Sequence, residues 1–308
     1  MTTTKVDDIA FVRFNAPDLD AMETFLTDFG LTRAHRDATT LYMRGTDSDP
    51  YYHVTHKGEP GFAGLAFEVK SPDDLQKLAR EYDAKVEPLD GPGGGQRVRL
   101  VDPNGFNIEA VAGRTPSPAQ SLPEAAPVND GRIKTRHNAR KQTQPGAAHV
   151  KRLGHAVLNV KDFRQSEQWY KQRFGFITSD EIKMSPEFAL GAFLRCDRGD
   201  QPADHHTLFL LGTGTPKFNH AAFEVADLDD LMKGHDLLKS KSYTPEWGIG
   251  RHILGSQIFD YWRDPWGHTL EHWTDGDLMT ADWGSREATM QDLIGVQWGM
   301  PMPANMGG

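Results

Sequence analysis

Short apolar stretches alternate with longer polar stretches along most of the chain. Val, Leu, Phe and Ala dominate residues 9–14, 64–69, 154–160 and 220–225, which is the composition of β-strands. Polar stretches with helix start signals follow two of them, Ser71-Pro-Asp-Asp-Leu and Ala226-Asp-Leu-Asp-Asp-Leu. The pattern predicts a strand, a helix and then several strands, repeated along the chain, and so an α+β fold.

The two halves of the chain repeat one another. The stretch Gly64-Leu-Ala-Phe-Glu-Val parallels His220-Ala-Ala-Phe-Glu-Val, and each half carries a Phe-Gly pair at the end of a polar stretch. Val101-Asp-Pro-Asn-Gly-Phe-Asn-Ile-Glu parallels Arg263-Asp-Pro-Trp-Gly-His-Thr-Leu-Glu, which predicts a turn followed by a strand. We therefore expect the same strand and helix order twice in each half.

A stretch rich in Pro, Ala, Ser and basic residues separates the halves. Residues 114–148 show no sustained periodicity, as a linker would, although such a segment could instead wrap over a domain. The sequence predicts an N-terminal domain at 1–113, a linker at 114–148 and a C-terminal domain with a tail at 149–308.

Two histidines and one glutamate lie in or beside the apolar stretches of the second half. They are His155, His220 and Glu271. Two neutral imidazoles and one carboxylate can form a facial triad that leaves coordination positions open, as in non-haem Fe(II) oxygenases. The sequence therefore predicts a metal centre with these three ligands.

The first half lacks this ligand set. Counting from the shared Phe-Gly pair places Ala10 opposite His155, and the shared Ala-Phe-Glu-Val stretch places Gly64 opposite His220. Only Glu109 matches its counterpart, Glu271. We expect the first half to be structural and the metal to lie in the second half.

Composition narrows the classes of partner. The chain has 308 residues and a net charge of −9, which argues against a nucleic-acid partner because phosphate binding requires clustered Lys and Arg. It has no run of 18 apolar residues, and its start lacks the apolar core of a secretion signal, so we expect no membrane span. Its one cysteine, Cys196, cannot form an intrachain disulfide, which fits a cytoplasmic protein and favours a packed strand residue over a catalytic thiol.

The Asp264-Pro-Trp-Gly-His turn, the paired modules and the trio of ligands resemble the vicinal oxygen chelate superfamily. The closer resemblance is to its two-domain type I extradiol catechol dioxygenases. It implies paired βαβββ modules in each domain and a C-terminal open barrel around one Fe(II). Mn(II) accepts the same ligand set. A homo-oligomer is also expected.

The resemblance also assigns polar residues around the metal. It implies that His252 and Tyr261 lie near the bound substrate, with the first-half counterparts at about Asp90 and Arg99. It further implies an acid–base histidine 14 or 15 residues ahead of His220, a spacing that both His206 and His205 satisfy. Neighbouring residues of a strand face opposite ways, so only one can face the metal, and we favour His206.

The implied reaction inserts both atoms of O2 into a catechol-type aromatic, beside the diol, and gives a muconic semialdehyde-type product. A metal-dependent isomerase or lyase on the same scaffold is the alternative, and a ligand-sequestering module without metal is a second one. His268 and His272 are expected to be neighbours of the site or surface groups, and the tail to lie near the pocket mouth. Arg251 could meet a substrate carboxylate, and the residues expected to form an apolar pocket are Val157, Trp247, Phe259, Trp266 and Trp273.

Overall fold

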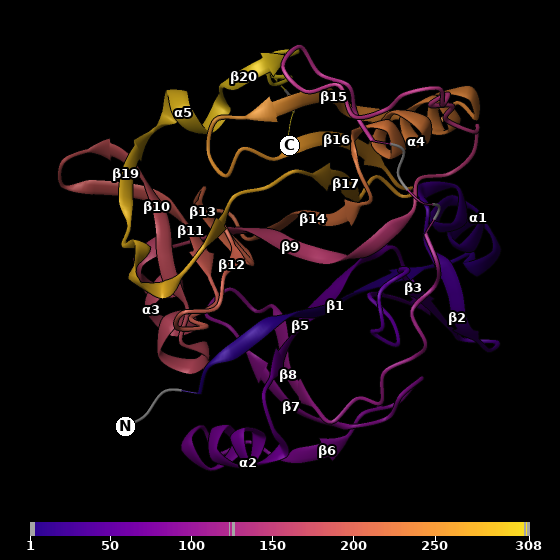
Figure 1. The fold of residues 1–308 in the computed structure, drawn as a ribbon. Helices are drawn as coiled ribbons and strands as arrows, with labels where there is room; N and C mark the ends of the chain where they lie inside the picture. The colour runs from indigo at the N-terminus through magenta and orange to yellow at the C-terminus, as the bar shows by residue number, and fades with distance from the viewer. Residues whose placement is uncertain (1–3, 123, 125–126, 305, 307–308) are drawn as a thin grey trace.

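Each half of the chain folds into two consecutive βαβββ units. The computed structural model describes residues 4–122, 124, 127–304 and 306 (Figure 1). The first half contains β1 (Val6–Ala16), α1 (Leu19–Phe29), β2 (Thr32–Arg36), β3 (Thr40–Arg44), β4 (His53–Lys57), β5 (Gly61–Val69), α2 (Pro72–Glu81), β6 (Val86–Pro88), β7 (Gln96–Val101) and β8 (Asn107–Ala112).

The second half repeats this order and extends it with one short strand inside the first unit and a C-terminal segment. Its elements are β9 (Val150–Val160), α3 (Phe163–Phe174), β10 (Ile177–Ser185), β11 (Phe188–Arg195), β12 (Ala203–Asp204), β13 (Leu208–Gly212), β14 (Lys217–Val225), α4 (Leu228–Ser240), β15 (Pro245–His252), β16 (Ile258–Arg263), β17 (Thr269–Thr274), β18 (Leu278–Met279), η1 (Ala281–Trp283), β19 (Arg286–Thr289), α5 (Met290–Ile294) and β20 (Val296–Gly299).

Two large sheets carry the fold. The first has the order β2-β3-β4-β1-β5-β8-β7-β6, and the second β19-β10-β11-β13-β9-β14-β17-β16-β15-β20. Within each sheet the leading strands of the two units pair antiparallel, β1 with β5 and β9 with β14. The second sheet is open at β19 and β20 and curls, since side chains from β9, β11, β13, β15 and β16 line one cavity. The predicted α+β class with an open barrel is confirmed.

Matching caps explain why the first helix of each half lies where it does. Asp18 accepts backbone hydrogen bonds at the start of α1, and Asp162 does the same for α3. Each helix ends at a glycine with positive φ, +113° at Gly30 and +68° at Gly175. Helix α3 is one residue longer than α1, with 12 residues against 11.

Apolar and polar contacts join the two halves. Phe218 of β14 packs edge-on against Phe14 of β1 at 5.2 Å between ring centroids and stacks on Phe62 of β5 at 4.5 Å. The ring of His272 stacks on Phe29 at 3.8 Å, and its Nε2 donates to the Phe29 carbonyl at 2.6 Å. The first half therefore packs against strand β17, which also carries Glu271, on the face opposite to the Glu271 side chain.

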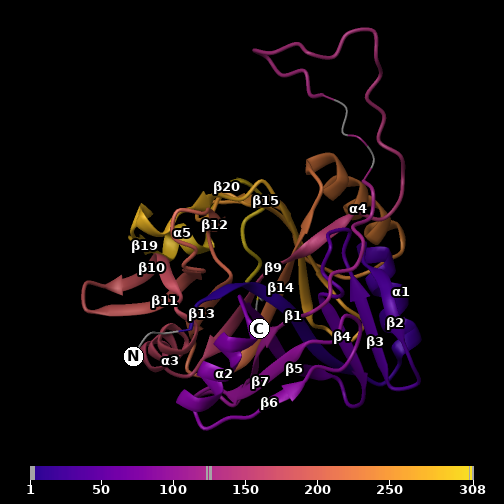
Figure 2. The same ribbon diagram turned by 60° about the horizontal axis from the view of Figure 1, so that its bottom comes forward.

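The described residues between β8 and β9 form neither helix nor strand. Figure 2 shows the later part of this segment extending away from the two sheets. Its beginning returns to the first half, where the Arg114 guanidinium binds Asp49 and Glu68. The boundaries 1–113, 114–148 and 149–308 stay predictions.

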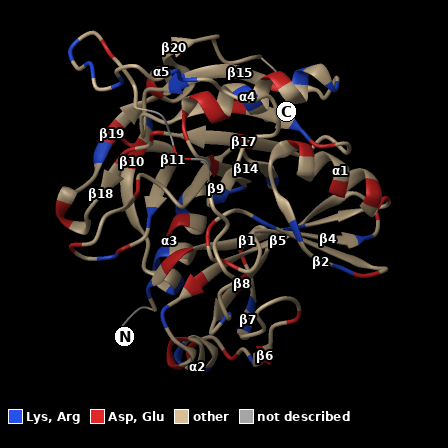
Figure 3. Ribbon diagram, turned by 45° about the vertical axis from the view of Figure 1, so that its right-hand side comes forward, with Lys and Arg blue, Asp and Glu red and all other residues tan. Residues whose placement is uncertain are grey.

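Acidic and basic residues are interspersed along the ribbon of both halves in Figure 3. Of the helices within the described ranges, none has the length and apolar character needed to cross a membrane. The expectation that nucleic acid is no partner stays a prediction.

Candidate metal centre and active site

Three neighbouring strands in the middle of the second sheet carry the predicted ligands. Strand β14 pairs with β9 on one side and β17 on the other, and Ala222 lies opposite both His155 and Glu271. His220 is two residues before Ala222, so its side chain faces the same way. The sheet register therefore brings all three side chains to one face.

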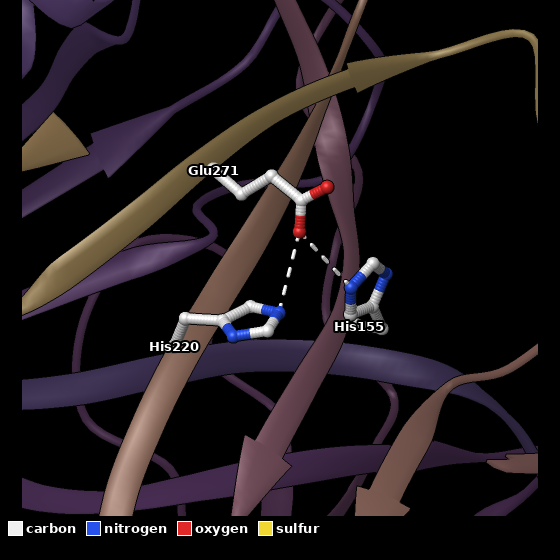
Figure 4. A group of neighbouring side chains, drawn as sticks. All are labelled: His155, His220 and Glu271. Atoms are coloured by element: carbon white, nitrogen blue, oxygen red, sulfur yellow. Dashed lines mark ion pairs between the residues drawn. The ribbon is translucent and has the colours of Figure 1, made fainter. Parts of the chain in front are cut away.

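The ligand atoms converge as a metal centre requires. The Nε2 atoms of His155 and His220 each lie 3.3 Å from Oε2 of Glu271, as the dashed lines of Figure 4 mark. One ligand atom from each residue lies within 4.8 Å of the others. This is the only such group of three or more among the residues that the structure describes.

The donor set fits a cation. Glu271 is fully buried, and neither of its carboxylate oxygens has a hydrogen-bond partner of good geometry among the described residues. Burial by itself raises the pKa of Glu271, but the two imidazoles outweigh it and hold that pKa below its usual range. A buried ionised carboxylate needs a countercharge, which a divalent metal between the three ligand atoms would provide.

Hydrogen bonding and burial keep the imidazoles available as ligands. Nδ1 of His220 lies 2.8 Å from Oδ1 of Asn219, which can only accept, so Nδ1 bears the hydrogen and Nε2 faces Glu271 as a lone pair. Burial lowers the pKa of His155, which keeps it neutral at neutral pH. Asn219 was not singled out from the sequence.

A cavity of about 330 Å³ opens beside the ligands. His155 and His220 lie in its wall together with His206, His252 and Tyr261. The rest of the wall is mainly apolar and comes from the curled sheet, from α5 and from the C-terminal tail. Its apolar members are Val157, Leu190, Phe193, Phe209, Leu211, Trp247, Leu254, Met290, Leu293, Ile294, Met302 and Met306.

His252 and Tyr261 form a hydrogen-bonded pair at the ligands. Nε2 of His252 lies 2.9 Å from the Tyr261 hydroxyl and 3.8 Å from Oε1 of Glu271. Tyr261 lies opposite Glu271 in the pairing of β16 with β17. Burial lowers the pKa of His252 to about 4, and burial together with the Glu271 carboxylate holds the pKa of Tyr261 well above its usual value.

His205 and His206 face different surroundings. His206 lines the cavity, and its ring centroid is 4.0 Å from that of His155. His205 is fully buried and turns to the Asp180 carboxylate, 2.7 Å from its Nε2. This geometry favours His206 as the acid–base residue, although that role stays a prediction.

Several expectations about the pocket are corrected by the structure. Val157 and Trp247 line the cavity, but Phe259, Trp266 and Trp273 do not. Phe259 stacks behind His252 at 4.1 Å, and Trp273 packs on Gly154. Both are two residues from Tyr261 or Glu271 and share their sheet face, but they lie further along the strands and pack against other residues.

The remaining basic candidates are held elsewhere. Arg251 donates to Asp275 and to the Ser256 carbonyl, each at 2.6 Å, and is not part of the cavity wall. His268 is bonded to Asp264 at 2.8 Å, which fits the expectation that it is no ligand.

Cys196 is buried with its Sγ 3.3 Å from Oγ1 of Thr207, and burial raises its pKa well above the usual value, as suits a packed thiol.

The C-terminal tail reaches the cavity, as expected. Met302 and Met306 belong to its wall, and the Trp247 indole donates to the Met300 carbonyl at 2.9 Å. Helix α5 lies in the same C-terminal segment and also contributes to the wall.

The first half holds the counterparts of the ligands. Gly64 and Glu109 occupy the register positions of His220 and Glu271, as predicted. The predicted match of His155 to Ala10 is wrong: Phe11 lies opposite Ala66 as His155 lies opposite Ala222. Counting from the Phe-Gly pair failed because α3 is one residue longer than α1.

Known proteins share both the sequence pattern and the fold. The sequence model of the Glyoxalase/Bleomycin resistance protein/Dioxygenase superfamily matches residues 152–272, which contain all three ligands. This part of the chain is therefore similar in sequence to the superfamily that the resemblance implied. The predicted resemblance to the extradiol dioxygenases of the superfamily is supported by the relatives described next.

Two curated relatives match nearly the whole chain. Metapyrocatechase 2 of Cupriavidus necator is 29% identical over 97% of this chain and 90% of its own length. Manganese-dependent 2,3-dihydroxybiphenyl 1,2-dioxygenase of Geobacillus genomosp. 3 is 25% identical over 96% and 94%.

Solved structures match the fold. Homoprotocatechuate 2,3-dioxygenase of Brevibacterium fuscum, complexed with 3,4-dihydroxyphenylacetate, superposes with a TM-score of 0.82 at 20% identity, covering 99% of this chain and 92% of the other. A Mn(II)-bound glyoxalase of Novosphingobium aromaticivorans gives 0.81 at 23% identity, covering 99% and 94%. At these identities the structures establish the fold alone.

Proposed function

We propose that the protein is an extradiol dioxygenase, an oxidoreductase that opens a catechol-type ring beside the diol with both atoms of O2. The observation that carries the proposal is the convergence of His155, His220 and Glu271 in the wall of an apolar cavity, next to three further protonatable side chains. The names of two relatives, a metapyrocatechase and a 2,3-dihydroxybiphenyl 1,2-dioxygenase, support the same activity.

The proposed metal ligands are His155, His220 and Glu271. When bound, Fe(II) or Mn(II) supplies the Lewis acidity that lowers the pKa of a catechol hydroxyl and the one-electron chemistry that lets an aromatic ring react with O2. Both metals suit this ligand set, and one of the relatives is manganese-dependent by name.

The polar residues of the cavity have distinct proposed tasks. Tyr261 keeps its proton and can donate a hydrogen bond to one substrate oxygen, and neutral His252 beside it can take the proton of a substrate hydroxyl. His206 faces the same space from the β11 and β13 side and is proposed to give a proton where the O–O bond breaks. Each task requires only a side chain that reaches the cavity.

The cavity also indicates which catechols fit. Within the described part of the chain, no Lys or Arg side chain lines it, and Arg251 is held by Asp275. A substrate carboxylate would be buried there without a counterion, which is costly. We therefore propose a catechol with an apolar, uncharged substituent as the substrate.

A catechol panel tests the proposal directly. Protein loaded with Fe(II) or Mn(II) is mixed under air with 3-methylcatechol, 2,3-dihydroxybiphenyl and 3,4-dihydroxyphenylacetate, and O2 uptake is followed with the absorbance of the ring-fission product. We expect turnover of the two apolar catechols and at least about tenfold lower kcat/KM for the carboxylate, which is about 1.4 kcal/mol of transition-state free energy. Absence of O2 uptake with every catechol would overturn the proposal.

One observation supports the alternative of a metal-dependent isomerase or lyase, namely the fold shared with a Mn(II)-bound glyoxalase. Such an enzyme needs no O2. Turnover of a non-aromatic substrate under anaerobic conditions, together with no reaction of catechols in air, would favour it. The expected homo-oligomer and the cytoplasmic location stay predictions.

A further inference from the structure

His205 and Asp180 form a buried chain of hydrogen bonds that ends at His206. Nε2 of His205 lies 2.7 Å from Oδ2 of Asp180, and Nδ1 of His205 lies 3.0 Å from Nδ1 of His206. Asp180 and His205 are 1% and 0% exposed, whereas His206 reaches the cavity. Neither Asp180 nor His205 touches the cavity or has a task in the proposed reaction.

The donor and acceptor of each hydrogen bond in this series can be assigned, because an ionised carboxylate can only accept hydrogen bonds. Asp180 also faces the Arg286 guanidinium at 3.5 Å, which suits an ionised carboxylate. Nε2 of His205 must therefore carry hydrogen and donate to Asp180. The Nδ1 of a neutral His205 is then an acceptor, so the hydrogen between the two rings belongs to Nδ1 of His206.

The His205 ring is also held in place mechanically. The backbone N–H of His205 donates to the Asp277 carbonyl at 2.9 Å, and its carbonyl accepts from the Ser179 hydroxyl at 2.6 Å. Gly255 packs so closely that an added Cβ would lie 2.9 Å from Nδ1 of the ring. A ring fixed in this way can fix the orientation of its neighbour.

We propose that Asp180 and His205 are positioning residues that hold His206 as the Nδ1–H tautomer, with an unprotonated Nε2 presented to the cavity. This Nε2 can take the proton of the second catechol hydroxyl and then give that proton where the O–O bond breaks. The proposal rests on the proposed function for the task of His206, but the tautomer can be measured by itself. It explains why two adjacent histidines occur at a place where only one can reach the substrate.

Two substitutions of His205 distinguish the effect of losing its hydrogen bond to His206 from the effect of changing the shape of the side chain. His205→Phe keeps a ring but removes the acceptor for Nδ1–H of His206. His205→Asn keeps an acceptor oxygen near the position of Nδ1 but loses the link to Asp180. His235→Phe is the matched control, because it removes another histidine bonded to a buried aspartate, Asp260 at 3.1 Å, away from the cavity.

Two measurements are made on the full chain. With an apolar catechol, we expect His205→Phe to lower kcat about tenfold or more, a part of the 10²–10⁴-fold that a positioned proton donor contributes. We expect unchanged metal content and unchanged anaerobic substrate affinity, activity largely restored in His205→Asn, and no loss in His235→Phe. In zinc-loaded protein, ¹⁵N NMR of the histidine rings should show the Nδ1–H tautomer of His206 in wild type and in His205→Asn, but not in His205→Phe.

The outcomes separate the two proposals. An Nε2–H tautomer of His206 in wild type would overturn this inference, whether or not catechols are cleaved. Equal kcat in His205→Phe and wild type would also overturn it while leaving the dioxygenase intact. Failure of wild type to cleave any catechol would overturn the proposed function instead.

Discussion

The two halves share one fold but treat the same buried glutamate in opposite ways. In the second half Glu271 faces two imidazole nitrogens, each 3.3 Å away, and no guanidinium of a described residue pairs with it. In the first half Glu109 binds the Arg13 guanidinium at 2.7 Å and faces that of Arg97 at 3.6 Å. The first half carries its countercharge in its own sequence, whereas in the second half the proposed metal would supply it.

The register shows where the difference originates. Arg13 lies opposite Gly64 as Val157 lies opposite His220, so a small apolar residue in one half corresponds to the cation in the other. The Arg13 guanidinium lies 4.6 Å from the ring of Phe11, the counterpart of His155. It thus fills the space between the counterparts of two ligands.

The first half lacks both histidines, and the one at the position of Gly64 cannot be regained by substitution. Gly64 has a φ of +140°, and a Cβ there would lie 2.4 Å from the Asn107 carbonyl oxygen. A histidine at this position would clash with backbone and strain the strand. Both the backbone and the side chains of the first half therefore disfavour a metal site there.

The strongest test removes the glutamate from each half in turn. Glu271→Gln should eliminate bound metal and ring cleavage. This effect should exceed the roughly 100-fold loss of metal affinity caused by removing a residue that hydrogen-bonds a metal ligand. Glu109→Gln should keep both, because Glu109 is paired with the Arg13 and Arg97 guanidinium groups and lies outside the proposed ligand set. Metal content by mass spectrometry and O2 uptake check this. Metal retained in Glu271→Gln and lost in Glu109→Gln would reverse the roles of the halves.

A second test introduces into the second half an arginine that corresponds to Arg13 of the first half. Val157→Arg should place a guanidinium near Glu271, as Arg13 lies near Glu109, and so compete with the metal. We expect a folded protein with little bound metal and no activity, whereas Val157→Met should keep its metal. A metal-loaded Val157→Arg protein would show that charge substitution does not explain the difference.

The reverse change tests stability. Arg13→Met leaves Glu109 buried without its main partner and should lower the free energy of unfolding by about 3–5 kcal/mol. Arg13→Met combined with Glu109→Leu should recover most of this loss, because two apolar residues need no countercharge. Urea unfolding of the single and double variants measures it. A double variant no more stable than Arg13→Met would exclude the ion pair as the cause.

The smallest expected effect concerns Asn219, whose counterpart in the first half, Ala63, has no amide. Asn219→Ala removes the acceptor for Nδ1–H of His220 and should weaken metal binding about 10- to 100-fold. Asn219→Asp keeps an acceptor and should bind nearly as well. Competition with a metal chelator gives both affinities, and equal affinity of wild type and Asn219→Ala would show that the contact is dispensable.

Much of the site was predictable because its signals are local. The repeated Ala-Phe-Glu-Val and Asp-Pro-X-Gly stretches fixed the correspondence of Gly64 with His220 and of Glu109 with Glu271. The predicted counterpart of His155 was wrong by one residue. We counted back from the Phe-Gly pair at the end of each helix, and the sequence does not show that α3 is one residue longer than α1. Strand pairing is set by hydrogen bonds between distant segments, so counting along the chain does not determine it.

The sequence by itself determined the fold class, the repeat and the residue types of the metal centre, because strand composition, turn residues and ligand chemistry depend on each residue and its near neighbours. Only the tertiary structure decided which side chains meet. It placed His206 at the cavity and His205 against Asp180, and it held Arg251 outside the pocket. These contacts join residues far apart in the chain, and their geometry arises from packing that no local pattern records.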